Sequence, residues 1–379
     1  MTDNAVADVP LARPEITDSE ERAVIEALRS GWVSEGPEVA RFEQSFAALV
    51  GTRHAVAVNS CTSALFLTLL ASGIKGEVLV PSYTWAATAN AVVAAGATPV
   101  WVDIEDRSFG MSPADAATKL TPATEAIVCV HLAGHACQVE ALAALADEHS
   151  LLLVEDAAQT LGGLVGDRQV GSFGVGCFSF FATKAITTGD GGMVTTDDEG
   201  LASAIRRRSR HGVATGSVPW HREALEVGFN MRMPNVLAAL GRAQLDRLDE
   251  MNLRRRSAAD ALTRLLAPCR DQVRPPIERP GFTHVYQMYL ATLTAATPRD
   301  ELVLALRRRG IEASVHFTPA VHRQAAYRDR WASGSDSLPV TEDVCERAVT
   351  LPIHPGISEA DLDRVAVATA DSLQEVSSQ

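Results

Sequence analysis

Short apolar runs alternate with helix-length amphipathic segments along the first half of the chain. Runs of four to seven apolar residues, each followed by a polar turn and a helical pattern, are typical of buried strands. Repeated strand–helix units predict a mainly parallel sheet that is covered by helices on both faces, with ligands at the carboxyl ends of its strands. The sequence therefore predicts an α/β fold. The runs fall at 54–58, 77–81, 98–104, 126–132 and 151–154.

The chain changes character in its second half, so we predict two domains. Arginine-rich helices follow Asp197, and the Pro275–Pro276 pair introduces shorter elements. We expect a large domain over 1–245 and a smaller α+β domain over 246–379, with the N-terminal helix packed against the smaller domain. The later strand and helix patterns fall at 286–293, 299–309, 311–317, 349–353 and 359–374.

Composition and charge narrow the class of protein. The 379 residues are 46% hydrophobic but contain no apolar run long enough to span a bilayer and no basic-then-apolar leader, so we expect a cytoplasmic globular protein. A net charge of −13 argues against nucleic-acid and membrane partners. Six cysteines without a CxxC pair are typical of reduced thiols.

Lysine is rare in this chain, and one lysine has an unusual place. Of the 34 basic residues only Lys75, Lys119 and Lys184 are lysines, and the first two lie in polar segments. Lys184 follows the Phe-rich run 177–181, where an ammonium is costly unless it is paired or neutralised. A neutral lysine can form a Schiff base with a carbonyl compound. The alternative is a strand-end lysine whose ammonium reaches solvent.

Four further residues fall, like Lys184, at or just beyond the ends of predicted strands. Thr62 and Ser63 open a helix after the first run, where free N–H groups and the helix dipole favour an anion. The alternative is that these two hydroxyls only cap the helix. Trp85 and Asp156 follow later runs. The shared position of these residues indicates one site.

This set of groups matches the requirements of pyridoxal 5′-phosphate (PLP). The cofactor's aldehyde needs a lysine, its phosphate a helix N-terminus, and its pyridinium nitrogen a carboxylate that keeps the ring an electron sink. Trp85 would stack on the ring, Gln159 would bond its phenolate oxygen, and Ser179 would add a hydroxyl at the phosphate. The order and spacing of these residues predict PLP as the cofactor.

Five sequence motifs resemble the DegT/DnrJ/EryC1/StrS family of sugar aminotransferases, and the resemblance covers nearly the whole chain. The most specific part is VEDAAQ followed by FSFFATK. The resemblance implies PLP fold type I, with a large domain built on a seven-stranded type of mainly parallel sheet and a smaller α+β domain. It also implies a PLP-dependent aminotransferase that cycles through pyridoxamine 5′-phosphate. The motifs are NSCTSAL, PSYTWAATANAV, VEDAAQ, GSFGVGCFSFFATKAITTGDGGMV and GFNMRM.

The resemblance also implies roles for individual residues. Lys184 is implied as the catalytic Schiff-base lysine, Asp156 as the partner of the pyridine nitrogen and Gln159 as the partner of the phenolate oxygen. Asn230, in a Gly-x-Asn-x-Arg motif, is implied to reach the phosphate in the partner subunit, which predicts a homodimer with shared active sites. The implied cofactor-binding residues are Thr62, Ser63, Trp85, Asp156, Gln159, Ser179, Lys184 and Asn230.

The reaction is likewise an implication of the resemblance. Glutamate or glutamine would give its amino group to a ketone, and a nucleotide-linked keto-sugar is the first expectation. The alternatives are a cyclitol ketone of an antibiotic pathway and a non-catalytic PLP-binding regulator, although this acidic chain lacks the length and basic face of an added DNA-binding module. Family members with His in place of Lys184 are dehydratases, so the lysine favours transamination.

A local cluster offers a different chemistry. Cys129, His131, His135 and Cys137 are four possible metal ligands within nine residues, and zinc sites use such ligands. The first two lie in an apolar run, where cysteine is often only a small core residue, so we expect no metal. The chain also lacks the G-x-G-x-x-G pattern of nicotinamide enzymes, and none of its lysines has the following Ser or Thr of a P-loop.

Overall fold

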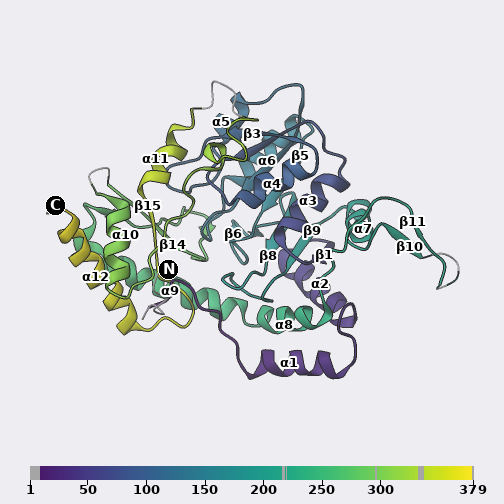
Figure 1. The fold of residues 1–379 in the computed structure, drawn as a ribbon, viewed down its shortest axis with the longest axis horizontal. Coiled ribbons are helices and arrows are strands. Elements are labelled where there is room, and N and C mark those ends of the chain that lie inside the picture. Colours follow the sequence, from purple (N-terminus) through teal and green to yellow (C-terminus); the bar gives the residue numbers. More distant parts are fainter. Residues whose placement is uncertain (1–8, 216–217, 219, 295–296, 332–336, 378–379) are drawn as a thin grey trace.

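A computed structural model describes residues 9–215, 218, 220–294, 297–331 and 337–377 (Figure 1). None of the helices within these ranges has the length and apolar composition needed to cross a membrane. The helices are α1 (Asp18–Arg29), α2 (Pro37–Val50), α3 (Cys61–Ala71), α4 (Ala86–Ala94), α5 (Pro113–Thr118), α6 (Val139–Glu148), α7 (Glu199–Arg208), α8 (Asn235–Leu245), α9 (Leu248–Leu265), α10 (Arg299–Arg308), α11 (Pro339–Arg347) and α12 (Glu359–Ser377). The strands are β1 (His54–Val58), β2 (Glu77–Pro81), β3 (Thr98–Val102), β4 (Thr124–Val130), β5 (Leu152–Asp156), β6 (Leu164–Val165), β7 (Arg168–Gln169), β8 (Val175–Ser179), β9 (Gly192–Thr196), β10 (Val213–Thr215), β11 (Arg222–Ala224), β12 (Val273–Arg274), β13 (Phe282–Thr283), β14 (Tyr289–Leu293) and β15 (Ala348–Leu351).

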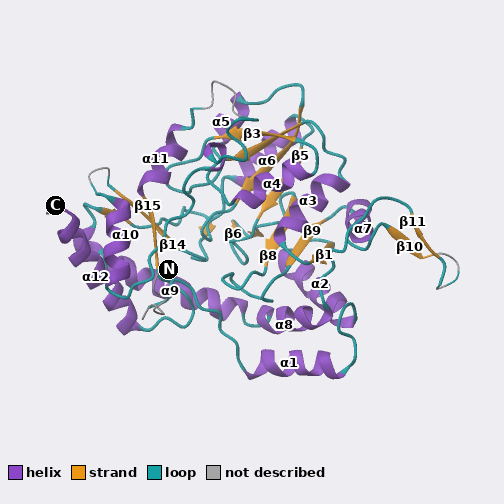
Figure 2. Cartoon of the chain, viewed as in Figure 1, coloured by secondary structure: helices purple, strands orange, loops and turns teal. Residues whose placement is uncertain are grey.

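The central sheet has seven strands in the order β1-β9-β8-β5-β4-β2-β3. From β8 to β3 every neighbouring pair is parallel, whereas β9 is antiparallel to both β8 and β1. Helices surround these strands (Figure 2). The predicted mainly parallel sheet is therefore confirmed, and the five apolar runs of the sequence correspond to β1 through β5.

Both faces of this sheet are buried, which explains why its strands are apolar at successive positions. In β1, Ala55 and Ala57 belong to a core shared with α2, α6 and α8, while Val56 and Val58 belong to a core shared with α3, α4 and α7. Successive side chains of a strand point to opposite faces, so a strand covered on both sides cannot alternate with polar residues.

A second, antiparallel sheet forms in the C-terminal region. Strands β12, β14 and β15 pair there, and a separate apolar core joins them to α9, α10 and α12. The long helix α9 contributes to two cores, with Leu248 and Met251 in the first and Leu262 in the C-terminal one. The division at residue 246 stays a prediction. The strand expected over 311–317 is wrong, because this segment makes only single bridges to the chain.

The N-terminal helix packs along α8 (Figure 1), in the range predicted for the larger domain, and it also contacts Arg247, in the range predicted for the smaller one. Glu20 decides the position of this helix. Its fully buried carboxylate accepts hydrogen bonds from the Thr17 N–H (2.9 Å), from Gln244 Nε2 (2.9 Å) and from Arg247 Nη1 (3.0 Å). The segment before the helix contacts the C-terminal region of the chain, because the Leu11 N–H donates to the Glu312 carboxylate at 2.8 Å.

We predict that Glu20→Gln destabilises the protein in a pH-dependent way. Burial acts to raise the pKa of Glu20, but hydrogen bonds from Thr17 and Arg247 lower it from 4.5 to about 2. A depressed carboxyl pKa stabilises the fold above the unfolded-state value, and this stabilisation is lost as the pH falls toward about 2. We expect the variant to lose about 2 kcal/mol of unfolding free energy at neutral pH.

Urea unfolding at several pH values measures this effect. From about pH 6 to about pH 3.5, the unfolding free energy of the variant should fall by roughly 1.4 kcal/mol less than that of the wild type. Glu250→Gln is the matched control, because Glu250 pairs with the same Arg247 from an exposed position. Parallel pH profiles of Glu20→Gln and the wild type would contradict the assignment.

Candidate active site

A cavity of about 480 Å³ opens at the carboxyl ends of the central strands. Six of the eight residues that the sequence places at PLP line this one cavity. These six are Thr62, Trp85, Asp156, Gln159, Ser179 and Lys184. The C-terminal region supplies a further part of the cavity wall, which consists of Gln287, Met288, His316, Phe317, Thr350, Leu351 and Ile353.

The N-terminus of α3 forms one end of the cavity. Ser60 caps this helix, because its Oγ accepts a hydrogen bond from the Ser63 N–H at 3.1 Å. The idea that Thr62 and Ser63 are themselves the caps is therefore wrong. The N–H groups of Cys61 and Thr62 are the first two of the helix and have no intrahelical acceptor, so they can bind an anion. Gly192 of β9 lies against this turn, where a Cβ would stand 2.4 Å from the Ser60 carbonyl carbon.

Ser63 and Asn230, the other two predicted residues, do not line the cavity. The Ser63 hydroxyl donates to Asn59 Oδ1 at 2.7 Å, on the inner side of the helix turn. Asn230 is exposed, and its side-chain oxygen accepts a hydrogen bond from Arg232 Nε at 3.2 Å. The contacts of Ser63 hold the turn that carries Thr62, whereas Asn230 is available to a second molecule.

Asp156 is a buried carboxyl at the end of β5. Thr88 Oγ1 of α4 donates to its Oδ2 at 2.7 Å, and the Ala158 N–H donates to its Oδ1 at 3.2 Å. Burial raises the pKa of Asp156, while these two hydrogen bonds and the charge of Lys184 act in the opposite direction. The Cys61 thiol adds a weak contact to Oδ1 at 3.9 Å, so the site holds a carboxyl with three donors and capacity for a further one.

Lys184 follows β8, and its amine faces the same cavity. Burial lowers the pKa of Lys184, and the charge of Asp156 opposes that shift. A lysine with a lowered pKa is closer to the neutral amine, which is the form that attacks a carbonyl and accepts protons. Lys184 therefore has the surroundings that formation of a Schiff base requires.

Gln159 and Trp85 complete the walls near Lys184. The Gln159 Oε1 accepts a hydrogen bond from the Ala133 N–H at 2.7 Å, which leaves its NH₂ group available to an acceptor in the cavity. Trp85 lies at the rim with 66% of its surface exposed, and its ring centroid is 6.1 Å from that of Phe317. An aromatic face this open can cover a flat ligand.

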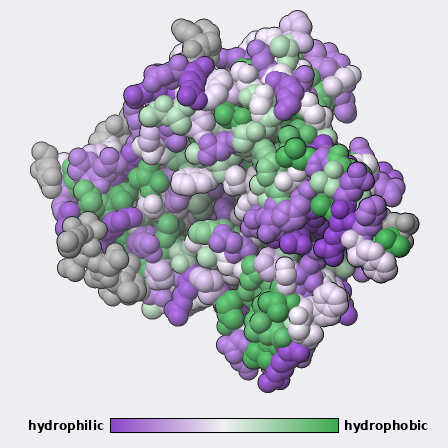
Figure 3. Space-filling model, turned by 45° about the vertical axis from the view of Figure 1, so that its right-hand side comes forward, coloured by the Kyte–Doolittle hydropathy of each residue, from purple (hydrophilic) through white to green (hydrophobic). Residues whose placement is uncertain are grey.

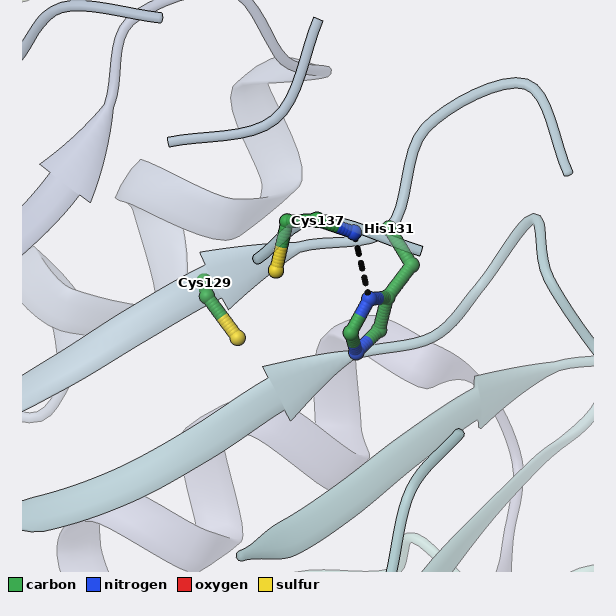
Figure 4. Close-up of side chains that lie close together, drawn as sticks. All are labelled: Cys129, His131 and Cys137. Carbon is green, nitrogen blue, oxygen red and sulfur yellow. Dashed lines mark hydrogen bonds between the residues drawn. The ribbon is translucent and has the colours of Figure 1, made fainter. Parts of the chain in front are cut away.

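The Cys/His cluster separates into two parts. His135 is bonded elsewhere, to the Ala136 carbonyl and the Arg279 N–H. The side chains of Cys129, His131 and Cys137 are buried and close together, with their potential ligand atoms within 4.8 Å of one another (Figure 4).

Both ring nitrogens of His131 are already used. Its Nδ1 accepts a hydrogen bond from the Cys137 N–H at 3.2 Å, and its Nε2 donates to the Glu155 carboxylate at 3.0 Å. Glu155 also accepts from the N–H groups of Gly171, Phe173 and Gly174. A metal ion would have to displace one of the His131 bonds, so this arrangement favours a structural polar network over a metal site.

Thr88→Val tests the support of the Asp156 carboxyl. The substitution keeps the shape of the side chain but removes the only side-chain hydroxyl that donates to Asp156 among the described residues. We expect the unfolding free energy to fall by about 1–3 kcal/mol, because a buried acceptor loses its donor. Thr88→Ser should retain most of the wild-type value. Urea unfolding measures both, and equal stability of Thr88→Val and the wild type would contradict this role.

Comparisons with known proteins agree with this site. The sequence pattern of the DegT/DnrJ/EryC1/StrS aminotransferase family matches residues 14–369. The chain is 38% identical over 376 residues to the spore coat polysaccharide biosynthesis protein SpsC of Bacillus subtilis, with 96% of each chain covered. It is 34% identical to DesI, crystallised in the presence of its TDP-sugar product, with a TM-score of 0.88 over 97% of this chain and 93% of DesI.

A third relative bears on the cofactor. Spr1654 of Streptococcus pneumoniae, known in a PLP form and a PMP form, is 27% identical; for the PLP form the TM-score is 0.91, with 97% of this chain and 99% of that chain covered. The predicted fold type, cofactor and enzyme class are thereby confirmed. The chain belongs to the DegT/DnrJ/EryC1/StrS aminotransferase family and is a PLP-dependent enzyme of fold type I.

Proposed function

We propose that the protein moves an amino group from glutamate or glutamine to the ketone of a nucleotide-linked sugar. Membership of an aminotransferase family supports this proposal, as do relatives in polysaccharide biosynthesis and TDP-sugar chemistry. One observation carries it: the amine of Lys184 and the carboxyl of Asp156 face a single cavity that also reaches the N-terminus of α3.

The α3 end of the cavity fits the phosphate of PLP. The N–H groups of Cys61 and Thr62 point out of the helix start, and the Ser179 side chain lines the cavity beside them. These groups would hold the phosphate. The position of Ser63 behind the turn gives no support to a direct phosphate contact.

The rest of the cavity fits the cofactor ring. Asp156 would accept a hydrogen bond from the pyridine nitrogen, Gln159 would donate to the phenolate oxygen, and Trp85 would cover the ring face. Lys184 would hold the aldehyde carbon. When bound, PLP supplies an electron sink for the negative charge that develops when a proton leaves an adjacent carbon.

The protein's part in the reaction is to orient groups and to move protons. Thr88 and the Ala158 N–H keep the Asp156 carboxylate in place. The Nζ atom of Lys184, whose pKa is lowered by burial, would accept the proton from the α-carbon of the donor. In the second half of the cycle the same atom would deliver a proton to the carbon that becomes the amine carbon of the product.

We also propose that two chains share their sites in a homodimer. Asn230 lies outside its own cavity and is exposed, as a residue that serves a partner must be. Apolar side chains gather at the lower end of the molecule, where α1 lies (Figure 3). Such an exposed patch is typical of a protein interface. The exposed apolar residues of α1 and the turn that follows are Ile25, Leu28, Trp32 and Val33.

Lys184→Ala should abolish turnover and the yellow absorption band while leaving the fold intact, because no other lysine lines the cavity. The wild type should show the band, and glutamate or glutamine should make it fade. Visible absorption before and after addition of each amino acid measures this. Lys75→Ala is a matched control, since the Lys75 amine donates to the Ala95 carbonyl at 2.5 Å, away from the cavity.

The outcomes separate the parts of the proposal. A Lys184→Ala protein with full activity would exclude Lys184 as the reactive amine. A wild-type band that both amino acids leave unchanged would contradict the proposed donors. Turnover with panels of keto-sugars, free and nucleotide-linked, would test the acceptor, and a preference for free keto-sugars would contradict the nucleotide-linked class.

Asn230→Ala should weaken cofactor retention by about tenfold, because a neutral hydrogen bond to the phosphate is lost across the subunit interface. Mixing provides the decisive control. A dimer formed from one Lys184→Ala chain and one Asn230→Ala chain would have one doubly altered site and one intact site. Mixed dimers should therefore recover wild-type cofactor affinity at half of their sites. No recovery on mixing would contradict a shared site.

A further inference from the structure

A small polar pocket adjoins the main cavity at Lys184, and we call it the annex. Its volume is about 10 Å³, counted as the space that the centre of a water-sized sphere can occupy. The annex therefore admits one group the size of a water molecule or a carboxylate oxygen. The annex and the main cavity share walls, which consist of Ala12, Thr183, Lys184, Gln287 and Ile353. Residues that line only the annex include Arg13, Arg255 and His354.

Gln287 presents an unused acceptor between the two spaces. Its Nε2 donates to the Thr183 carbonyl at 2.5 Å, which fixes the orientation of the amide. Its Oε1 is buried without a hydrogen-bond partner. Leaving a buried amide oxygen unpaired is costly, so native structures rarely keep one without a reason. The side chain is therefore suited to a ligand that brings a donor next to Lys184.

Arg255 presents a buried positive charge that forms no ion pair with the described residues. It is 5% exposed and makes two hydrogen bonds, to Asn252 Oδ1 (3.3 Å) and to the Ala185 carbonyl (3.2 Å). Its neighbours on α9 are paired differently, since Arg254 contacts Glu15 and Glu250, and Arg256 contacts Glu278. Among the described residues no carboxylate lies within ion-pair distance of Arg255. A buried guanidinium of this kind favours an anion.

The other polar residues of the annex add no negative charge. Burial lowers the pKa of His354, and the nearby charge of Arg13 lowers it further, while the charge of Asp361 acts in the opposite direction. The Nδ1 atom of His354 is also buried without a partner. Arg13 is exposed at the edge of the pocket. The annex thus combines positive charge with unpaired neutral acceptors.

We propose that the annex and Gln287 recognise the α-amino acid that donates the amino group. Arg255 would bind the α-carboxylate, and the Gln287 carbonyl oxygen would accept a hydrogen bond from the α-ammonium as it approaches Lys184. This assignment rests on the proposed function and deepens it. An α-amino acid carries both a carboxylate and an ammonium on one carbon. These two groups match the Arg255 guanidinium and the Gln287 carbonyl oxygen, which line one small pocket together with Lys184.

The dimensions of the annex exclude other occupants of the cavity. A sugar phosphate is too large for a space that admits a single small oxygen, and a neutral keto-sugar offers nothing to a buried guanidinium. A bound water molecule would satisfy Gln287 but would leave the charge of Arg255 uncompensated. The donor's body would occupy the main cavity, with one carboxylate oxygen in the annex.

The test compares Arg255→Lys and Gln287→Met with the matched control Arg256→Lys in the cofactor-loaded enzyme. The rate at which the yellow band fades is measured against the concentration of glutamate and of glutamine. We expect the half-saturating concentration to rise about tenfold in the first two variants, since each loses a charge-assisted hydrogen bond, and to stay within about twofold in the control.

A second readout does not depend on turnover. Glutarate, which has the carboxylates but no ammonium, should raise the melting temperature of the wild type and of Gln287→Met, because it binds the folded state. It should not raise that of Arg255→Lys. Unchanged half-saturation in both variants, or equal stabilisation of Arg255→Lys by glutarate, would overturn the proposal and leave the annex a water site.

The results for the wild type and for the variants distinguish a failure of this proposal from a failure of the proposed function. A wild-type band that no α-amino acid changes would refute the donor reaction itself. A wild type that reacts while both variants keep its donor affinity would refute only the annex. If Arg255→Lys does not fold, Gln287→Met still decides the matter, because wild-type half-saturation for both amino acids in that variant would overturn the proposal.

Discussion

The site depends on two oppositely ionisable groups that are held in one cavity, at or just beyond the ends of neighbouring strands. Asp156 ends β5, and Lys184 follows β8, the strand that pairs with β5 in parallel. Burial shifts both pKa values toward the neutral forms, and the charge of each group partly opposes the shift of the other. Thr88 keeps the carboxyl hydrogen-bonded. A carboxylate acceptor and a nucleophilic amine can coexist here only because the parallel register brings them to one cavity.

Features that depend on the local pattern of apolar and polar residues could be predicted from the sequence. Strands that are buried on both faces must be apolar at successive positions, so β1 to β5 could be found directly. Their ends located Thr62, Trp85 and Asp156, and the Phe-rich run of β8 located Lys184. Contacts between distant segments could not be found in this way. Gln287 reaches the cavity through a hydrogen bond to the carbonyl of Thr183, more than a hundred residues away, and no spacing records it.

Side-chain pairing also bears on questions that spacing alone leaves open. In the sequence, Cys129, His131 and Cys137 have the ligand types of a zinc site, but hydrogen bonds already use both nitrogens of the imidazole. The helix that begins at Asp18 has a capping box that any segment could carry, and it packs on α8 because Glu20 finds Gln244 and Arg247 there. A buried polar group must lie next to its hydrogen-bond partners, and here those partners are distant in the sequence.

The same rule explains why unpaired groups near Lys184 carry functional meaning. Only four buried side-chain polar atoms in the described part of the chain lack a partner, and two of them belong to Gln287 and His354, which line the annex. Elsewhere the chain satisfies costlier groups, such as the Glu155 carboxylate with its three backbone N–H donors. Among the described residues Arg255 likewise has no carboxylate at ion-pair distance, at a place where a ligand can provide one.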